Sequence, residues 1–200
     1  MIQNIIIKLE LHKKWVETSG KEGEKLRVQE VDFRNFDLSD RFLEQANIIN
    51  CVFDNLNIKN MDLHASVLCS STFENANVDT CDFYKSDLSY TNFSKATLNS
   101  VRFARSDCWE TMFKSADLID CNLSAISFTL TDFSNARLNN VDISESRFEN
   151  VSFNGVILKN IKGIDEANFQ SINIGTPESP EILVGKEAAR WLQDNSLNNE

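Results

Sequence analysis

The sequence predicts an all-β solenoid, a coil of short strands stacked along one axis, and three observations support this. Apolar residues recur every five positions without interruption from Phe33 to Leu158, 26 times in all. A helix needs them three and four residues apart, so this spacing excludes one. A second period of twenty residues overlies the first. Finally, the 131 residues from Glu24 to Asn154 contain neither glycine nor proline, whereas hairpin proteins need such residues at their turns.

The period of twenty indicates four sides in each coil. Every fourth member of the five-residue series is phenylalanine, and the members one step later are all aliphatic. A coil of twenty residues places each set in one interior column, and stacking buries apolar residues that a single unit cannot bury alone. The phenylalanine column comprises Phe33, Phe53, Phe73, Phe93, Phe113, Phe133 and Phe153, and the aliphatic column comprises Leu38, Ile58, Val78, Leu98, Leu118, Leu138 and Leu158.

A second inward side chain is expected two residues before each of these centres. The residue there is usually small or aliphatic, as at Ala46, Cys51 and Ser86, and Arg41 is the one charged exception. The residue just before the centre is polar in 21 of the 26 units. Two inward and three outward side chains therefore make up each unit. Residues twenty apart become axial neighbours, which predicts surface ion pairs between Asp82 and Arg102 and between Asp117 and Arg137.

These units resemble the pentapeptide-repeat family, whose motif is a small residue, Asp or Asn, Leu or Phe, and then two polar residues. The units ADLID (116–120), SDLSY (86–90), TNFSK (91–95) and TDFSN (131–135) match this motif well. The resemblance covers about two thirds of the chain. It implies a right-handed quadrilateral β-helix, which we assign to residues 31–175.

Residues 1–30 are expected to form an N-terminal cap, a helix followed by a lead-in strand, because the open end of a solenoid needs covering. The helix would end at Thr18–Gly20, and Leu26 and Val28 would lead into the first coil. A partner-binding or membrane-surface helix is the alternative, although its polar face lacks the basic bias typical of a membrane helix. The residues expected on one helical face are Ile5, Ile6, Leu9, Trp15 and Val16.

Residues 176–200 are expected to form a C-terminal helix and a frayed tail. The repeat register breaks at Gly163, and after one extra residue it resumes with centres at Phe169 and Ile174. A helix beginning at Ser179–Pro180 either folds back on the last coil or contacts a second copy in a homodimer. Its apolar face would comprise Val184, Ala188, Trp191 and Leu192.

Composition narrows the class of protein. The net charge of −10, from 20 basic and 30 acidic residues, argues against direct binding to DNA or RNA, whose partners are usually basic. No apolar run is long enough to span a membrane, and the first residues lack the pattern of a signal peptide. Five cysteines without a CxxC motif are typical of free thiols in a reducing compartment. We therefore expect a cytoplasmic protein without a membrane association.

No catalytic constellation is visible, and we expect no cofactor, no metal and no enzymatic activity. Both histidines, His12 and His64, are expected at the surface. An enzyme or small-molecule binder is the least favoured class, because a packed interior leaves no cavity. The thiols of Cys51, Cys81, Cys108 and Cys121 are expected in the core, and that of Cys69 outside it.

One side of the coil carries unusually many outward apolar groups. This side is centred on Ile48, Leu68, Leu88, Cys108, Phe128 and Phe148. Exposed aromatic and aliphatic side chains rimmed by charge are typical of a protein interface. The alternatives are that the C-terminal segment covers this stripe or that the residues are scattered surface hydrophobics. The candidate partner-binding residues are Ile49, Cys69, Tyr90, Trp109 and Leu130, with the acidic residues Asp87, Asp107 and Glu110.

These observations favour a non-enzymatic scaffold that binds an unidentified protein. The family resemblance implies an alternative, a DNA mimic that binds a type II topoisomerase such as DNA gyrase and confers resistance to antibiotics that inhibit it. The acidic composition and the candidate C-terminal dimer fit that alternative. The spread of negative charge over all four sides and the polar C-terminal tail do not.

Overall fold

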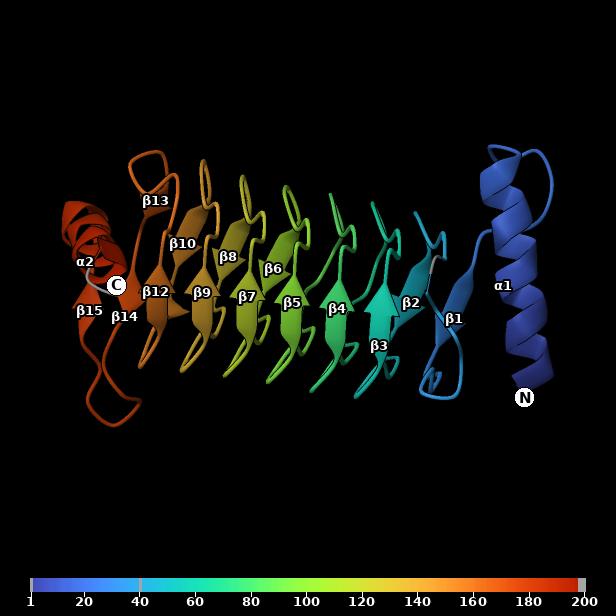
Figure 1. Cartoon of the computed structure of the whole chain (residues 1–200), viewed down its shortest axis with the longest axis horizontal. Helices are drawn as coiled ribbons and strands as arrows, with labels where there is room; N and C mark the ends of the chain where they lie inside the picture. The colour runs from blue at the N-terminus through green and yellow to red at the C-terminus, as the bar shows by residue number, and fades with distance from the viewer. Residues whose placement is uncertain (1, 40, 198–200) are drawn as a thin grey trace.

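The computed structural model describes residues 2–39 and 41–197. It is a parallel β-solenoid with one helix at each end (Figure 1). Successive coils stack from the N-terminal helix α1 (Ile2–Glu17) to the C-terminal helix α2 (Gly185–Leu197). The predicted fold class, a quadrilateral β-helix with a capping helix before it and a helical segment after it, is confirmed.

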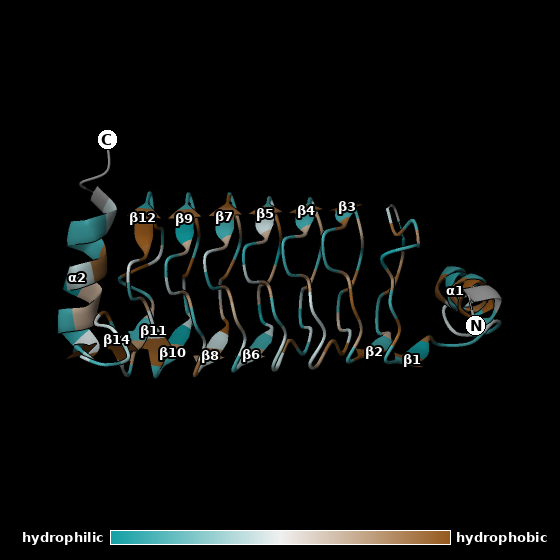
Figure 2. Ribbon diagram, turned by 90° about the horizontal axis from the view of Figure 1, so that it is seen from below, coloured by the Kyte–Doolittle hydropathy of each residue, from teal (hydrophilic) through white to brown (hydrophobic). Residues whose placement is uncertain are grey.

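Two sides of the coil carry most of the regular strands, and isolated bridges join most coils on the other two sides. One strand-bearing side is a six-stranded parallel sheet of β3 (Asn57–Lys59), β4 (Asn77–Asp79), β5 (Thr97–Asn99), β7 (Asp117–Ile119), β9 (Arg137–Asn139) and β12 (Ile157–Lys159). The other carries β1 (Arg27–Gln29), β2 (Asn47–Ile49), β6 (Asp107–Trp109), β8 (Ser127–Thr129), β10 (Arg147–Glu149) and β13 (Asn168–Phe169). Figure 2 shows these two sides along opposite edges of the solenoid.

The strands pair in the predicted register of twenty. Val78 lies opposite Leu98, and Leu98 lies opposite Leu118. The phenylalanine column is likewise confirmed, because its successive rings stack with centroids 4.5–5.4 Å apart. All seven rings are buried. Offset stacking at this distance stabilises aromatic pairs beyond the burial of their area, so the column links the coils along the whole axis.

The chain turns nearly all its corners without glycine, Gly155 being the exception, by placing every fifth residue in the left-handed region. From Gln45 to Asn160 these residues have φ between +50° and +65°. Asparagine tolerates this conformation better than other non-glycine residues, and it occupies the corners at Asn55 and Asn75, among others. At several corners a backbone hydrogen bond closes the turn, as from Ser66 N–H to the Leu63 carbonyl (3.1 Å).

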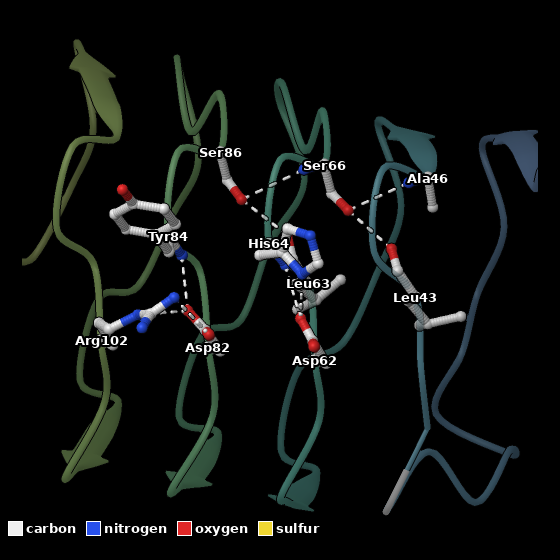
Figure 3. Close-up of polar contacts among 10 residues, drawn as sticks. All are labelled: Leu43, Ala46, Asp62, Leu63, His64, Ser66, Asp82, Tyr84, Ser86 and Arg102. Carbon is white, nitrogen blue, oxygen red and sulfur yellow. Dashed lines mark hydrogen bonds and ion pairs between the residues drawn. The ribbon is translucent and has the colours of Figure 1, made fainter. Parts of the chain in front are cut away.

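The small inward residues bind the coils to one another through their hydroxyl groups. Ser86 Oγ donates to the Leu63 carbonyl (2.7 Å) and accepts from the Ser66 N–H (3.3 Å). Ser66 Oγ repeats the arrangement one coil earlier, with the carbonyl of Leu43 and the N–H of Ala46 (Figure 3). A small hydroxyl therefore adds a hydrogen-bonded link between neighbouring coils to backbone groups that already pair with each other at the corner.

Helix α1 lies across the first coil. Its residues Ile5 and Leu9 are buried, whereas Ile6, expected on the same face, is exposed. Arg41, the charged residue at an inward position, makes an ion pair with Glu10 of α1 (3.2 Å). The helix ends before Thr18, as the sequence indicated.

The prediction of a surface position for His12 is wrong. Its imidazole is fully buried, and Nδ1 accepts the Leu26 N–H (3.0 Å). The ring stacks on Trp15 with centroids 5.6 Å apart. His12 follows Ile5 and Leu9 at the four- and three-residue spacing of one helical face, and this face packs on the coil. His64 is half-buried on an outer position of its coil.

The break near the C-terminus follows the predicted extra residue. Phe148 pairs with Phe169, an offset of twenty-one. Gly163 has φ +75°, and a Cβ added there would collide with the Ser144 backbone. A glycine is therefore required where the next centre would fall. The chain then forms β11 (Val151–Ser152), β14 (Ile172–Asn173) and β15 (Ile182–Leu183), of which β15 is antiparallel to β14.

The expected start of the C-terminal helix is wrong by several residues, because β15 occupies that segment and α2 begins at Gly185. Ala188 and Leu192 are buried against the end of the solenoid, and Trp191 stacks near Phe153 (6.5 Å between centroids). Val184 precedes the helix and is half-exposed, so it does not share this contact. Residues 198–200 of the predicted frayed tail lie outside the described residues.

Candidate interaction surface

The geometry of the repeat places Trp109 on the outer face of the solenoid. Trp109 is the last residue of β6, directly after the buried centre Cys108. Because successive side chains of a strand point to opposite faces, the indole turns outward, and 49% of the residue is exposed. In the neighbouring strand β8, Thr129 lies opposite Trp109.

Tyr90 and Leu130 lie at corners on the coils to either side of Trp109. Tyr90 N–H donates to the Trp109 carbonyl (2.7 Å), and Leu130 N–H donates to the Glu149 carbonyl (2.9 Å). Tyr90 is 51% exposed and Leu130 47%. We call Tyr90, Trp109 and Leu130 the Trp109 patch. Three consecutive coils thus present a large apolar side chain on the same side.

Two members of the Trp109 patch occupy backbone positions that disfavour them. Tyr90 has φ +61° and Leu130 has φ +56°. Asn50 and Asn150 occupy the equivalent corner in other coils of this side. A bulky residue in the left-handed region costs about 1–2 kcal/mol, and strain of this kind concentrates at functional sites. Neither local conformation nor burial explains a Tyr and a Leu at these corners.

Acidic groups surround the Trp109 patch. Trp109 Nε1 donates to the Glu110 carboxylate (3.0 Å), and Glu110 occupies the corner between those of Tyr90 and Leu130. Asp87 and Asp107 lie opposite each other on adjacent coils of the same side, where a backbone β-bridge joins them. Partial burial acts to raise the pKa of Asp87, but hydrogen bonds from Ser89 outweigh it and hold the pKa below its usual value. The carboxylate therefore stays charged near neutral pH.

Some of the predicted interface residues lie apart from this patch. Ile49 and Cys69 are half-buried on earlier coils of the same side. Burial raises the pKa of the Cys69 thiol to about 12, and its hydrogen bond with Asp87 acts in the same direction. The sequence analysis missed Met112, which is 39% exposed two residues after Glu110. Its position just before a centre, where most units have a polar residue, is the signal that could have found it.

Helix α2 packs on the end of the solenoid rather than on the Trp109 patch. Its buried residues Ala188 and Leu192 join the core near β12 and β13. Because Tyr90, Trp109 and Leu130 remain about half-exposed, the described part of the C-terminal segment does not cover the stripe.

A polar cluster on another side of the coil has structural contacts. His64 Nδ1 lies 2.9 Å from Asp62 Oδ1. Arg102 pairs with Asp82 (2.8 Å) and lies over the Tyr84 ring, 4.3 Å from its centroid (Figure 3). The predicted pairs Asp82–Arg102 and Asp117–Arg137 (2.8 Å) are therefore both present. Exposed pairs of this kind contribute about 0–1 kcal/mol.

The thiols are poorly suited to nucleophilic chemistry. Burial raises the pKa of Cys81 to about 11 and that of Cys121 to about 12, and Cys51 and Cys108 shift in the same direction. These four cysteines are buried, as predicted, and all five are free. Within residues 2–39 and 41–197, no three His, Cys, Asp or Glu side chains gather as a metal site. In the same residues, neither helix is both long and apolar enough to cross a bilayer.

Comparison with known proteins identifies the repeat. The family model for pentapeptide repeats matches residues 62–99, 91–129 and 116–155, with 8 copies. A comparison with curated protein sequences found no match.

Several solved structures are similar to this chain. The pentapeptide repeat protein Rfr23 from the cyanobacterium Cyanothece 51142 has 18% identity over 60% of this chain and 89% of its own, with a TM-score of 0.38. QnrB1, a plasmid-mediated fluoroquinolone resistance protein, has 14% identity over 72% and 77%, with a TM-score of 0.32. HetL, a pentapeptide repeat protein involved in heterocyst differentiation regulation in Nostoc sp. strain PCC 7120, has 13% identity over 84% and 97%, with a TM-score of 0.28.

The matched residues occupy the middle of the solenoid, and the same five-residue unit, with its inward pair and left-handed corner, continues on both sides of them. The chain therefore belongs to the pentapeptide-repeat proteins.

Proposed function

We propose that this protein is a non-enzymatic scaffold that binds a partner protein through the Trp109 patch. The observation that carries the proposal is the exposure of Tyr90, Trp109 and Leu130 on three consecutive coils. Tryptophan and tyrosine dominate the energetics of protein interfaces because they bury a large area with little loss of side-chain entropy.

The strained corners add independent support. If Tyr90 and Leu130 had no role, an Asn in their place would relieve the left-handed strain without loss of core packing. The sequence retains two bulky residues there, next to the exposed indole. Such a departure from local preference is expected where function requires the side chain.

The acidic rim defines the chemistry of the partner. Asp87, Asp107 and Glu110 lie beside the apolar side chains, so a complementary surface has an apolar centre and basic groups at its rim. The charges contribute mostly to the rate and selectivity of association, and the aromatic contacts contribute most of the affinity.

The topoisomerase alternative has less support from the arrangement of charge. A mimic of DNA needs negative charge that extends along the rod. Here basic side chains neutralise several carboxylates between successive coils, as Arg102 does for Asp82 and Arg137 for Asp117. Gyrase, which the family resemblance implies, is nevertheless included among the partners to be tested.

The proposal is tested by combining Tyr90→Ser and Trp109→Ser in the full chain and measuring binding of proteins from a cell extract to the immobilised variant. Ile157→Ser is the matched control, because Ile157 is 50% exposed on the opposite sheet. Purified gyrase is included as a separate sample.

We expect at least one protein to bind the unsubstituted chain and the Ile157→Ser control and to be lost with the double variant. Equal retention by all three chains would remove the Trp109 patch as the binding site. Retention of gyrase, together with protection of its supercoiling activity from a quinolone, would favour the topoisomerase alternative instead.

A further inference from the structure

The N-terminal end of the solenoid has a second feature suited to binding, separate from the Trp109 patch. We propose that the free edge of β1 binds an extended segment of a partner protein, which adds to the solenoid as one further strand.

The hydrogen bonds of β1 (Arg27–Gln29) show which of its edges is free. The Leu26 carbonyl accepts the Asn47 N–H (2.9 Å), and the Glu30 N–H donates to the Ile49 carbonyl (3.1 Å). Along a strand, the backbone N–H and C=O groups of successive residues point alternately to one edge and to the other. The N–H and C=O groups of Arg27 and Gln29 therefore point away from β2.

Helix α1 covers this edge incompletely. Lys8 Nζ donates to the Arg27 carbonyl (3.4 Å), but a groove of about 700 Å³ remains between α1 and β1. Figures 1 and 2 show α1 lying beyond β1 at this end of the molecule. A volume of this size is within the range of ligand-binding sites, which is roughly 300–1,000 Å³.

The walls of the groove favour a peptide with alternating apolar side chains. Ile5 of α1 lines one wall, and Val31 and Phe36 of the first coil line the other. Val31 and Phe36 are only partly buried by the coil itself. An extended segment hydrogen-bonded to Arg27 and Gln29 presents every second side chain to these residues.

Charge on the groove is divided between its two ends. Lys8 and Arg27 lie near the start of β1, and Glu30 follows its end. Asp32, also at the groove, is occupied by an ion pair with Arg34 (2.7 Å). A complementary segment therefore has an acidic residue near Lys8 and Arg27, apolar residues between, and a basic residue near Glu30.

The position of α1 favours a peptide segment over a second copy of this chain. α1 lies across the same end, where Ile5, Leu9 and His12 are buried against the coil. The groove beside it admits a single strand, whereas the end of another solenoid would meet the helix.

The test uses two blocked heptapeptides as probes, Glu-Val-Thr-Val-Thr-Val-Lys and its charge-reversed order Lys-Val-Thr-Val-Thr-Val-Glu. One order matches the groove if the segment runs parallel to β1, and the other matches if it runs antiparallel. Binding to the full chain is measured by fluorescence polarisation, and hydrogen exchange reports the amides of Arg27 and Gln29. A peptide of the same sequence with alternate N-methylated amides is the control for backbone pairing.

We expect one order to bind and to slow exchange at both amides, and the N-methylated peptide to bind at least tenfold more weakly. Gln29→Pro removes an N–H that the β1–β2 ladder does not use, and an edge strand tolerates proline. It should weaken binding about tenfold, which corresponds to the loss of one hydrogen bond. Lys8→Glu should weaken binding to a similar extent, and Lys21→Glu, in the loop outside the groove, by less than about twofold.

The proposal is overturned if neither peptide binds at about 1 mM, the weakest range of specific recognition. Binding that N-methylation and Lys8→Glu leave unchanged would also overturn it, whether or not Gln29→Pro folds. Slow exchange at Arg27 and Gln29 that appears without peptide and increases with protein concentration would assign the edge to a second copy instead.

Discussion

Individual residues carry the strain that allows this chain to wind with almost no glycine. Every fifth residue from Gln45 to Asn160 is left-handed, and most of these positions carry a polar side chain that faces water. A local conformational cost repeated at every corner must be offset by the burial of two side chains per unit. At Tyr90 and Leu130 a large, half-exposed side chain meets this cost and gains little from burial.

Leu130→Asn is expected to stabilise the protein and to weaken binding to its partner. Asn tolerates the left-handed region, so relief of strain should raise the free energy of unfolding by about 0.5–1 kcal/mol. Urea denaturation measures the change. Ile157→Asn is the matched control, because Ile157 is similarly exposed but lies in β12. It should not stabilise, since Asn disfavours strands. An equal effect at both positions would contradict the role of the corner.

Ser86→Ala is expected to lower the free energy of unfolding by about 1–3 kcal/mol. The substitution removes two hydrogen bonds between neighbouring coils, to the Leu63 carbonyl and from the Ser66 N–H, and leaves these two groups with only the bond that they make to each other. Denaturation of Ser94→Ala provides the comparison, because Ser94 is half-buried at an outer position. A loss no greater than that of Ser94→Ala would show that the inward hydroxyl contributes only its size.

At the scale of the element, α1 depends on a neutral histidine. The Leu26 N–H donates to His12 Nδ1, so the imidazole proton must lie on Nε2. Burial is the main cause that lowers the pKa of His12 below 6.5, and the nearby charge of Lys25 adds to it. Protonation of Nδ1 would place two donors against each other and remove this contact between α1 and the lead-in strand.

The stability of the chain is expected to fall as the pH decreases below about 6.5, the ordinary pKa of histidine. In that range the unfolded chain binds a proton at His12 that the folded chain resists, so acid favours unfolding until the pH passes the lowered pKa of the folded state. Glu44 has the opposite effect on stability at the pH where it titrates. Burial raises its pKa, so the folded chain binds this proton more readily than the unfolded chain. Denaturation midpoints at pH 7.5, 6.5 and 5.5 measure the effect.

His12→Gln should remove most of this pH dependence, and His64→Gln, at the other histidine of the chain, is the comparison. If the stability of His12→Gln declines with pH as steeply as that of the unsubstituted chain, another group controls α1.

At the scale of the whole molecule, the solenoid is a one-dimensional stack in which each coil contacts only its neighbours. The two ends are therefore its weakest points, and capping them contributes to stability and prevents association between edges. Helix α2 covers the C-terminal end through Ala188 and Leu192, with Trp191 near the last phenylalanine of the column.

Leu192→Asp is expected to destabilise the monomer by several kcal/mol, because it places a charge in a buried contact. Lys186→Ser, on the exposed start of α2, is the control and should have little effect. Denaturation at several protein concentrations separates the two roles considered for this segment. A loss of stability that is independent of concentration supports a cap within one chain, whereas concentration dependence in the unsubstituted protein would indicate a homodimer contact.

The exposure of the candidate interaction surface was predictable in part. The five-residue repeat specifies for every position whether its side chain points inward or outward. It therefore correctly predicted that Trp109, directly after the inward residue Cys108, is exposed. Ile49 and Cys69 were predicted to be part of the same surface because they lie on the same side of the coil. Neighbouring groups nevertheless leave both side chains half-buried. The count of outward residues could not reveal this, since exposure depends on what lies on adjacent coils. The groove beside β1 was not predicted, because it depends on where α1 packs.

The sequence by itself determined the periodic part of the molecule, namely the four-sided coil, the twenty-residue register, the phenylalanine column and the extra residue before Phe169. Each unit repeats the same short-range constraint, so the pattern alone specifies which side chains point inward. Only the tertiary structure decided the ends. The burial of His12, the exposure of Ile6 and Val184, the strand β15 and the start of α2 at Gly185 depend on single contacts with the first or last coil, and no repeat reports those contacts.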